Sequence, residues 1–140
     1  MTVIHGTFTL DRVYAAPPAR VFAAWADPEA KARWFAGPGA TGHELDFRVG
    51  GREVNRGGEL TYASVYHDIV PDERIVYAST LHDGKTLATV SLTTVEFGPA
   101  DAGTRLILTE QDAYLDGHEE PAWRESGTSA WLEALAVELR

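Results

Sequence analysis

Two charged residues fall inside predicted strands, where they could serve as buried acids, bases or ion-pair partners. Arg12 shares a predicted strand face with Leu10, and Glu110 shares one with Leu108, because alternate residues of a strand point to the same side. A carboxylate buried on such a face is costly unless it is paired or protonated, which makes Glu110 a candidate acid or base. The alternative, which we favour, leaves both residues at strand ends in water or pairs them with each other.

The histidines give no local metal motif. The five are His5, His43, His67, His82 and His118, and no two lie four residues apart on a predicted helix. A His-Glu-x-x-His run is also lacking. We therefore interpret them as surface and turn residues and predict neither a metal nor a cofactor. The absence of cysteine excludes disulfides, thiolate metal sites and a cysteine nucleophile.

Glycine and serine motifs of known catalytic or phosphate-binding sites are missing as well. The pairs Gly50-Gly51 and Gly57-Gly58 precede no helix, whereas a phosphate cradle uses the N–H groups of a helix N-terminus. No Gly-x-Ser-x-Gly elbow is present, and Ser126 lies in a predicted helix without an obvious base. These glycines are expected in turns and bulges, and a serine hydrolase is disfavoured.

Charge and hydropathy limit the partners and the compartment. The formal net charge is −9, and the 12 basic residues are scattered, so binding to a phosphate backbone is disfavoured. No apolar run approaches the roughly 20 residues of a membrane span, and the N-terminus resembles no signal peptide. With 140 residues, the chain is expected to form one cytoplasmic domain over residues 1–140.

The remaining pattern predicts an α+β fold. A strand over 7–14 is followed by two short helices, one around Val21 and Trp25 and one that starts at Asp27-Pro28 and ends near Phe35. Strands are then predicted over 44–49, 52–55, 59–70, 74–82, 85–97 and 104–112, separated by Gly, Pro and Asp turns. Such a meander leaves one apolar sheet face to be covered.

A long helix from Glu119 to the C-terminus is the element able to cover that face. Its predicted apolar side comprises Trp123, Gly127, Ala130, Trp131, Ala134 and Leu135, spaced as a helical stripe. Arg124 belongs to the predicted outer side. A mid-helix glycine costs about 1 kcal/mol relative to alanine, so Gly127 implies either close packing against the sheet or space left for a ligand.

Aromatic side chains could converge beneath this helix. The set comprises Trp34, Phe35, Phe47, Tyr62, Tyr66, Tyr77, Trp123 and Trp131. Pockets with apolar walls and a few polar groups are the usual ligand sites, and Trp and Tyr suit such walls. The residues alone leave open whether these side chains line a cavity or fill an ordinary core.

Several segments resemble the START-like, or SRPBCC, superfamily, and within it the branch of the activator of the 90-kDa heat-shock protein's ATPase. They are Arg12–Trp25, Asp27–Glu29, Trp34–Pro38, Asp46–Arg52, Pro71–Tyr77 and Gly103–Thr109. The resemblance spans about Thr7 to Leu139. It implies a helix-grip fold: a curved antiparallel sheet of six to seven strands around a long C-terminal helix, with two short helices after the first strand.

The resemblance also implies an internal cavity that holds a lipid-like or aromatic ligand. It therefore favours the interpretation that the aromatic side chains line a cavity over an ordinary core. The expected ligand-binding residues are Trp34, Phe47, Tyr66, Tyr77, Glu110, Trp123, Gly127 and Trp131. We expect a binding module for a hydrophobic small molecule. Two alternatives are a polyketide cyclase-like enzyme, with Glu110, Tyr77 and His67 as candidate acid–base groups, and a protein with a chaperone partner. The oligomeric state stays open.

Overall fold

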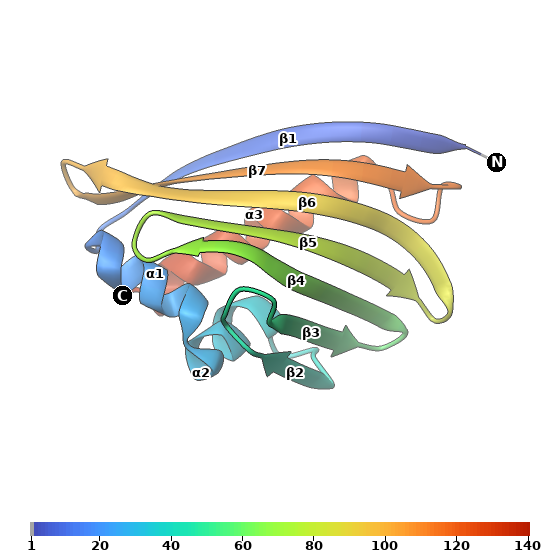
Figure 1. Ribbon diagram of the computed structural model, residues 1–140, viewed down its shortest axis with the longest axis horizontal. Coiled ribbons are helices and arrows are strands. Elements are labelled where there is room, and N and C mark those ends of the chain that lie inside the picture. Colours follow the sequence, from blue (N-terminus) through green and yellow to red (C-terminus); the bar gives the residue numbers. More distant parts are fainter. Residues whose placement is uncertain (1) are drawn as a thin grey trace.

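Antiparallel pairing of neighbouring segments builds one curved seven-stranded sheet with α3 across one face (Figure 1). The computed structural model describes residues 2–140, and the strand order is β1-β7-β6-β5-β4-β3-β2. The strands are β1 (Val3–Tyr14), β2 (Gly42–Leu45), β3 (Arg52–Gly57), β4 (Leu60–Val70), β5 (Arg74–Asp83), β6 (Thr86–Ala100) and β7 (Gly103–Leu115). The predicted helix-grip architecture is confirmed.

The helical elements are α1 (Pro18–Ala26), α2 (Pro28–Lys31), the π-helical turn η1 (Ala32–Ala36) and α3 (Pro121–Glu138). Proline stands at the first position of each α-helix, where its missing N–H costs nothing. The Asp27 carboxylate accepts a 3.1 Å hydrogen bond from the Ala30 N–H, which caps α2 as the sequence predicts. Gly37 ends η1 with φ of 75°, a conformation that favours glycine.

Alternation along the strands separates the two faces of the sheet. In β7 the side chains of Leu106, Leu108, Glu110 and Asp112 all point to the buried face. The hydrophobic core beneath combines Leu106 and Leu108 with apolar residues of the other strands, the short helices and the last turns of α3. Within residues 2–140, no helix is long and apolar enough to cross a membrane.

The orientation of α3 differs from the sequence prediction. Its buried residues are Arg124, Thr128, Leu132 and Leu135, whereas Trp123 is 67% exposed. The buried face of α3 is therefore shifted by about one residue from the predicted one: Arg124, Thr128 and Leu132 are buried in place of Trp123, Gly127 and Trp131. The predicted stripe excluded Arg124 because of its charge, but the sheet provides buried partners for that charge.

Two strand predictions also need correction. The strand expected over 44–49 covers only Gly42–Leu45, because residues 46–51 form a tight loop. In this loop a Cβ on Gly51 would collide with the backbone oxygens of Asp46 and Arg48. The first strand begins at Val3 rather than Thr7, which makes it one of the longer strands of the sheet.

Candidate functional site

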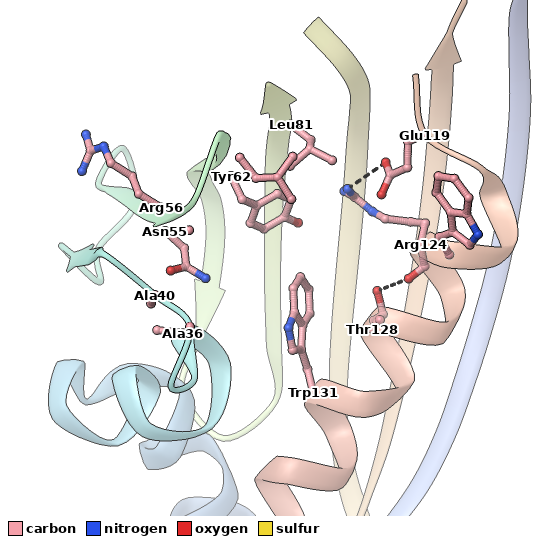
Figure 2. A pocket seen from close by; sticks show the side chains of 15 residues that line it. Ala36, Ala40, Asn55, Arg56, Tyr62, Leu81, Glu119, Arg124, Thr128 and Trp131 are labelled. Atoms are coloured by element: carbon pink, nitrogen blue, oxygen red, sulfur yellow. Dashed lines mark hydrogen bonds and ion pairs between the residues drawn. The ribbon is translucent and has the colours of Figure 1, made fainter. Parts of the chain in front are cut away.

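A cleft opens between the first half of α3 and strands β3 to β5 of the sheet (Figure 2). It has a volume of about 240 Å³. Residues of η1 and the following loop form one wall, β3 to β5 form the floor, and α3 forms the opposite wall. The lining residues are Ala36, Gly39, Ala40, Asn55, Arg56, Gly57, Leu60, Tyr62, Leu81, Glu119, Trp123, Arg124, Gly127, Thr128 and Trp131.

The aromatic part of the cleft is fixed by ring contacts. The Trp131 ring centroid lies 4.4 Å from that of Phe35 and 5.7 Å from that of Tyr62. At the rim, Trp123 and Leu60 are both exposed, at 67% and 47%. Trp123 and Leu60 therefore give the rim exposed apolar surface, and apolar surface at a groove is a feature of ligand-binding sites.

The buried Arg124 side chain forms the polar wall. Its Nε donates to Glu110 Oε2 at 2.9 Å, and its Nη2 donates to Ser91 Oγ at 2.8 Å. The Nη1 group donates to Glu119 Oε1 at 3.4 Å. The guanidinium carbon also lies 5.0 Å from the centre of the Tyr62 ring, within the range of a cation–π interaction. Arg124 therefore joins the cleft to the interior of the sheet.

The charges around Arg124 are mostly negative. Besides Glu110 and Glu119, Asp112 lies on the same face of β7 and accepts a 2.8 Å hydrogen bond from the Tyr114 hydroxyl. Burial, together with hydrogen bonding to Glu110 and the charge of Glu110, raises the pKa of Asp112 to about 7. Glu110 and Glu119 thus share the Arg124 guanidinium, so this wall of the cleft offers no net positive charge to an anion. On the opposite side of the cleft, Arg56 is paired with Glu44 at 3.6 Å.

Two buried polar atoms at the cleft have no hydrogen-bond partner. They are Asn55 Oδ1 and the Tyr62 hydroxyl oxygen. Burial raises the pKa of Tyr62 to about 12, so the hydroxyl stays protonated at neutral pH. Leaving such groups unpaired costs about 1–3 kcal/mol each, and a ligand or water that reached them would recover part of that cost.

Gly127 lies on the cleft side of α3 without a packing reason. A Cβ at this position would meet no atom within 4 Å. Close packing between helix and sheet, one of the two explanations that the sequence left open, is therefore wrong. What remains is that the missing side chain leaves the cleft wider at this point.

The structure brings three of the eight predicted site residues to the cleft, namely Trp123, Gly127 and Trp131. Glu110 lies behind the wall, 1% exposed and bound to Arg124. The favoured expectation that Glu110 sits in water or pairs with Arg12 is wrong. Arg12 instead donates to Ser129 Oγ at 2.8 Å.

The other four predicted residues do not line the cleft. Trp34 is buried and donates from Nε1 to the Ala24 carbonyl at 2.8 Å. Phe47, Tyr66 and Tyr77 form a row of edge-to-face contacts with centroid separations of 5.0 and 5.7 Å. These side chains fill the interior, as the packed-core alternative predicts.

Sequence reasoning missed a second buried polar cluster. The Glu53 Oε1 atom accepts from Lys31 Nζ at 2.9 Å and from the Tyr66 hydroxyl at 2.8 Å, while Oε2 lies 2.8 Å from His43 Nε2. The His43 side chain is only 7% exposed, so its assignment to the surface is wrong. Lys31 and Glu53 lie 22 positions apart, and no local signal pairs them.

Neither this cluster nor any other group in the described part of the chain forms a metal centre. Across residues 2–140, no group of three or more His, Asp or Glu side chains is arranged to hold a metal ion. The buried cluster is saturated by its own hydrogen bonds. The cleft therefore remains the candidate site.

Known structures resemble the chain over nearly its whole length. An uncharacterized protein from Rhizobium leguminosarum is 41% identical, with a TM-score of 0.95 and coverage of 99% of this chain and 96% of that one. The Mll3558 protein from Rhizobium loti is 45% identical, with a TM-score of 0.92 and coverage of 99% and 100%. No curated protein matches the sequence.

A more distant structure shares the fold alone. The DynU16 protein of the dynemicin biosynthetic locus is 18% identical, with a TM-score of 0.71 over 95% of this chain and 46% of that one. The sequence also matches the family model described as Activator of Hsp90 ATPase homolog 1-like protein over residues 15–140. The chain therefore belongs to the family of Activator of Hsp90 ATPase homolog 1-like proteins, in agreement with its sequence resemblance.

Proposed function

We propose that the protein binds a small, neutral, largely apolar or aromatic molecule in the cleft between α3 and the sheet. The observation that carries the proposal is Gly127, which leaves open space in the wall of the cleft. A glycine inside a helix costs about 1 kcal/mol relative to alanine. Gly127 is exposed and packing does not require a glycine there, so the space beside it is available to a ligand.

The walls of the cleft suggest the chemistry of the ligand. Trp131, Trp123 and Leu60 offer apolar and aromatic contacts, and Asn55 Oδ1 and the Tyr62 hydroxyl lack partners. A volume of about 240 Å³ is below the roughly 300–1,000 Å³ of sites for drug-sized molecules. A compact molecule of one or two rings carrying a hydrogen-bond donor fits these features best.

The charges favour a neutral ligand and binding rather than proton transfer. Arg124 is already bound to Glu110 and Glu119, so an incoming carboxylate would compete with both. The charged groups at this wall, Arg124 of α3 and Glu119 just before the helix, are paired with each other, which leaves neither poised as an acid or base. A cyclase-like activity and a chaperone partner stay predictions.

Native mass spectrometry of the protein purified from its own host tests the proposal directly. A retained small molecule, lost from the variant Gly127→Leu, is expected. Ser126→Leu enlarges the side chain at the preceding helix position, which does not line the cleft, and is the matched control. Calorimetric titration with 2-naphthol, a neutral two-ring probe, should show binding to the wild type and to Ser126→Leu but not to Gly127→Leu. Equal binding by all three would refute the site.

A further inference from the structure

The strand β1 leaves one long edge of the sheet without a partner. It spans Val3–Tyr14 at one end of the strand order, whereas the opposite edge strand, β2, spans only Gly42–Leu45 (Figure 1). An edge strand presents unpaired N–H and C=O groups that can pair with another chain. Long edges are usually protected, so the exposed side of β1 calls for an explanation.

The hydrogen-bond pattern tells which residues of β1 present their backbone to this open edge. The Asp116 N–H donates to the Thr2 carbonyl at 2.7 Å, in the register that pairs Val3 with Leu115. Bonded pairs alternate along an antiparallel ladder. Even-numbered residues of β1 therefore bond to β7, and odd-numbered ones point their N–H and C=O outwards. The Asp11 carbonyl agrees with this, because it accepts a 3.0 Å bond from the Arg12 side chain.

We propose that two copies of the protein associate by antiparallel pairing of their β1 strands, with the two-fold axis at Phe8. In this register Val3 lies opposite Val13 of the second copy, His5 opposite Asp11, and Thr7 opposite Thr9. All are odd-numbered, so each pair uses the free N–H and C=O groups. The two sheets then join into one continuous sheet.

Self-complementarity of the side chains supports this register. Val3 and Val13 are 53% and 58% exposed, and the pairing covers both in each copy. Each His5 imidazole faces an Asp11 carboxylate that also binds Arg105 of its own chain, and the half-buried Phe8 rings meet across the axis at a non-hydrogen-bonded pair, where side chains approach most closely. A shift of the axis to Thr7 or Thr9 would place Val3 opposite Asp11 or leave it unpaired.

On the face of the sheet that α3 covers, a groove between β1 and α3 provides room for the second copy. It has a volume of about 670 Å³ and is lined by Leu10 and Arg12 and by α3 residues, most of them small: Ala122, Glu125, Ser126, Ser129, Ala130 and Glu133. In the proposed register, Ile4 of the second copy lies opposite Arg12 and therefore next to this groove. Ile4 is 49% exposed in the single chain, and the groove would cover it.

Cross-linking tests the register directly, because the natural chain contains no cysteine. The variant Phe8→Cys places two thiols opposite each other at the axis and should form a disulfide-linked dimer under mild oxidation. The matched control is Ile4→Cys, also on β1 and even-numbered, which faces Arg12 of the second copy and should stay uncross-linked. Equal cross-linking of both variants would overturn the register.

Sedimentation equilibrium of the full chain tests the association without relying on a cysteine variant. The wild type should show a concentration-dependent monomer–dimer equilibrium. Val3→Lys, which places an ammonium opposite Val13 of the second copy twice per dimer, should raise the dimer Kd about tenfold, whereas Val49→Lys, at a similarly exposed valine away from β1, should leave it unchanged. A wild type that stays monomeric up to millimolar concentration, or Val3→Lys and Val49→Lys that shift the Kd equally, would overturn the proposal.

Discussion

The Lys31 ammonium and the Glu53 carboxylate form an ion pair inside the protein, with 2.9 Å between Nζ and Oε1. Their side chains are 1% and 2% exposed. Aromatic rings enclose the ammonium, which lies 4.5 Å from the Phe35 centroid and 5.0 Å from that of Trp25. Burial alone would raise the pKa of Glu53, but Lys31 and the hydrogen bonds from His43, Lys31 and Tyr66 hold it at about 2.

Removing one member of this pair should destabilise the protein strongly. Glu53→Gln leaves the Lys31 charge buried without a counter-charge, and such changes cost about 3–5 kcal/mol. Urea unfolding at pH 7 measures this loss. The double variant Lys31→Met/Glu53→Gln removes both charges, and its free energy of unfolding should be higher than that of Glu53→Gln alone. A double variant less stable than Glu53→Gln would contradict this account.

Acid provides an independent check on the same pair. Because the folded pKa of Glu53 lies below the unfolded value of about 4.3, its stabilising contribution is present above that value and is lost as pH falls towards 2. The free energy of unfolding of Glu53→Gln should therefore decline less than that of the wild type between pH 4 and pH 2.

The sequence predicted the order of elements because that order depends on local signals. Alternation in β7, proline at the helix starts and the Asp27 cap each act within a few residues. The strand prediction failed where tertiary contact decided the outcome: residues 46–49 alternate like a strand, but Gly51 folds the chain back over Asp46. Local patterns therefore sufficed for the architecture but not for every boundary.

The candidate site was harder to predict because its polar groups meet across the fold. Arg124 was expected on the outer side of α3, since a charge on a helix usually faces water. It is buried because Glu110 and Ser91, on two different strands, receive its guanidinium. Trp131 and Gly127 were found from helical spacing, whereas the aromatic row of Phe47, Tyr66 and Tyr77 could not be told from a cavity lining by residue type.

Asp112 should make the stability of the protein fall as pH rises towards neutrality. Its folded pKa of about 7 lies above the unfolded value of about 3.9. The folded state therefore holds a proton that the unfolded state releases, and the free energy of unfolding declines across this interval by up to about 1.4 kcal/mol per pH unit. Asp112→Asn, which mimics the protonated group, should flatten that decline in urea titrations between pH 4 and pH 7.

Asp101→Asn, a change in the exposed turn between β6 and β7, is the control for this experiment and should keep the wild-type slope. The groups that face Asp112 are Glu110, Tyr114 and Arg124, and none of them is altered in either variant. An unchanged slope in Asp112→Asn would show that another group holds the proton.

Gly103 should tolerate no side chain. Its φ is 145°, and a Cβ there would lie 2.7 Å from the Ala16 N and closer still to the Tyr14 carbonyl oxygen. Both atoms belong to the backbone and cannot move aside. Gly103→Ala should therefore cost more than about 2 kcal/mol, measured as a lowered urea midpoint. Gly98→Ala, five residues earlier in β6, meets no atom within 4 Å and should leave the midpoint nearly unchanged.

Gly127→Ala tests whether Gly127 is needed for the stability of α3 or only leaves space in the cleft. Since the added methyl group meets nothing within 4 Å, the helix should gain about 1 kcal/mol in the free energy of unfolding. The reverse change, Ala130→Gly, at an exposed position of the same helix outside the cleft, should lose a similar amount. If Gly127→Ala instead destabilises the ligand-free protein, the glycine serves packing or backbone geometry, and the argument that it keeps the cleft open fails.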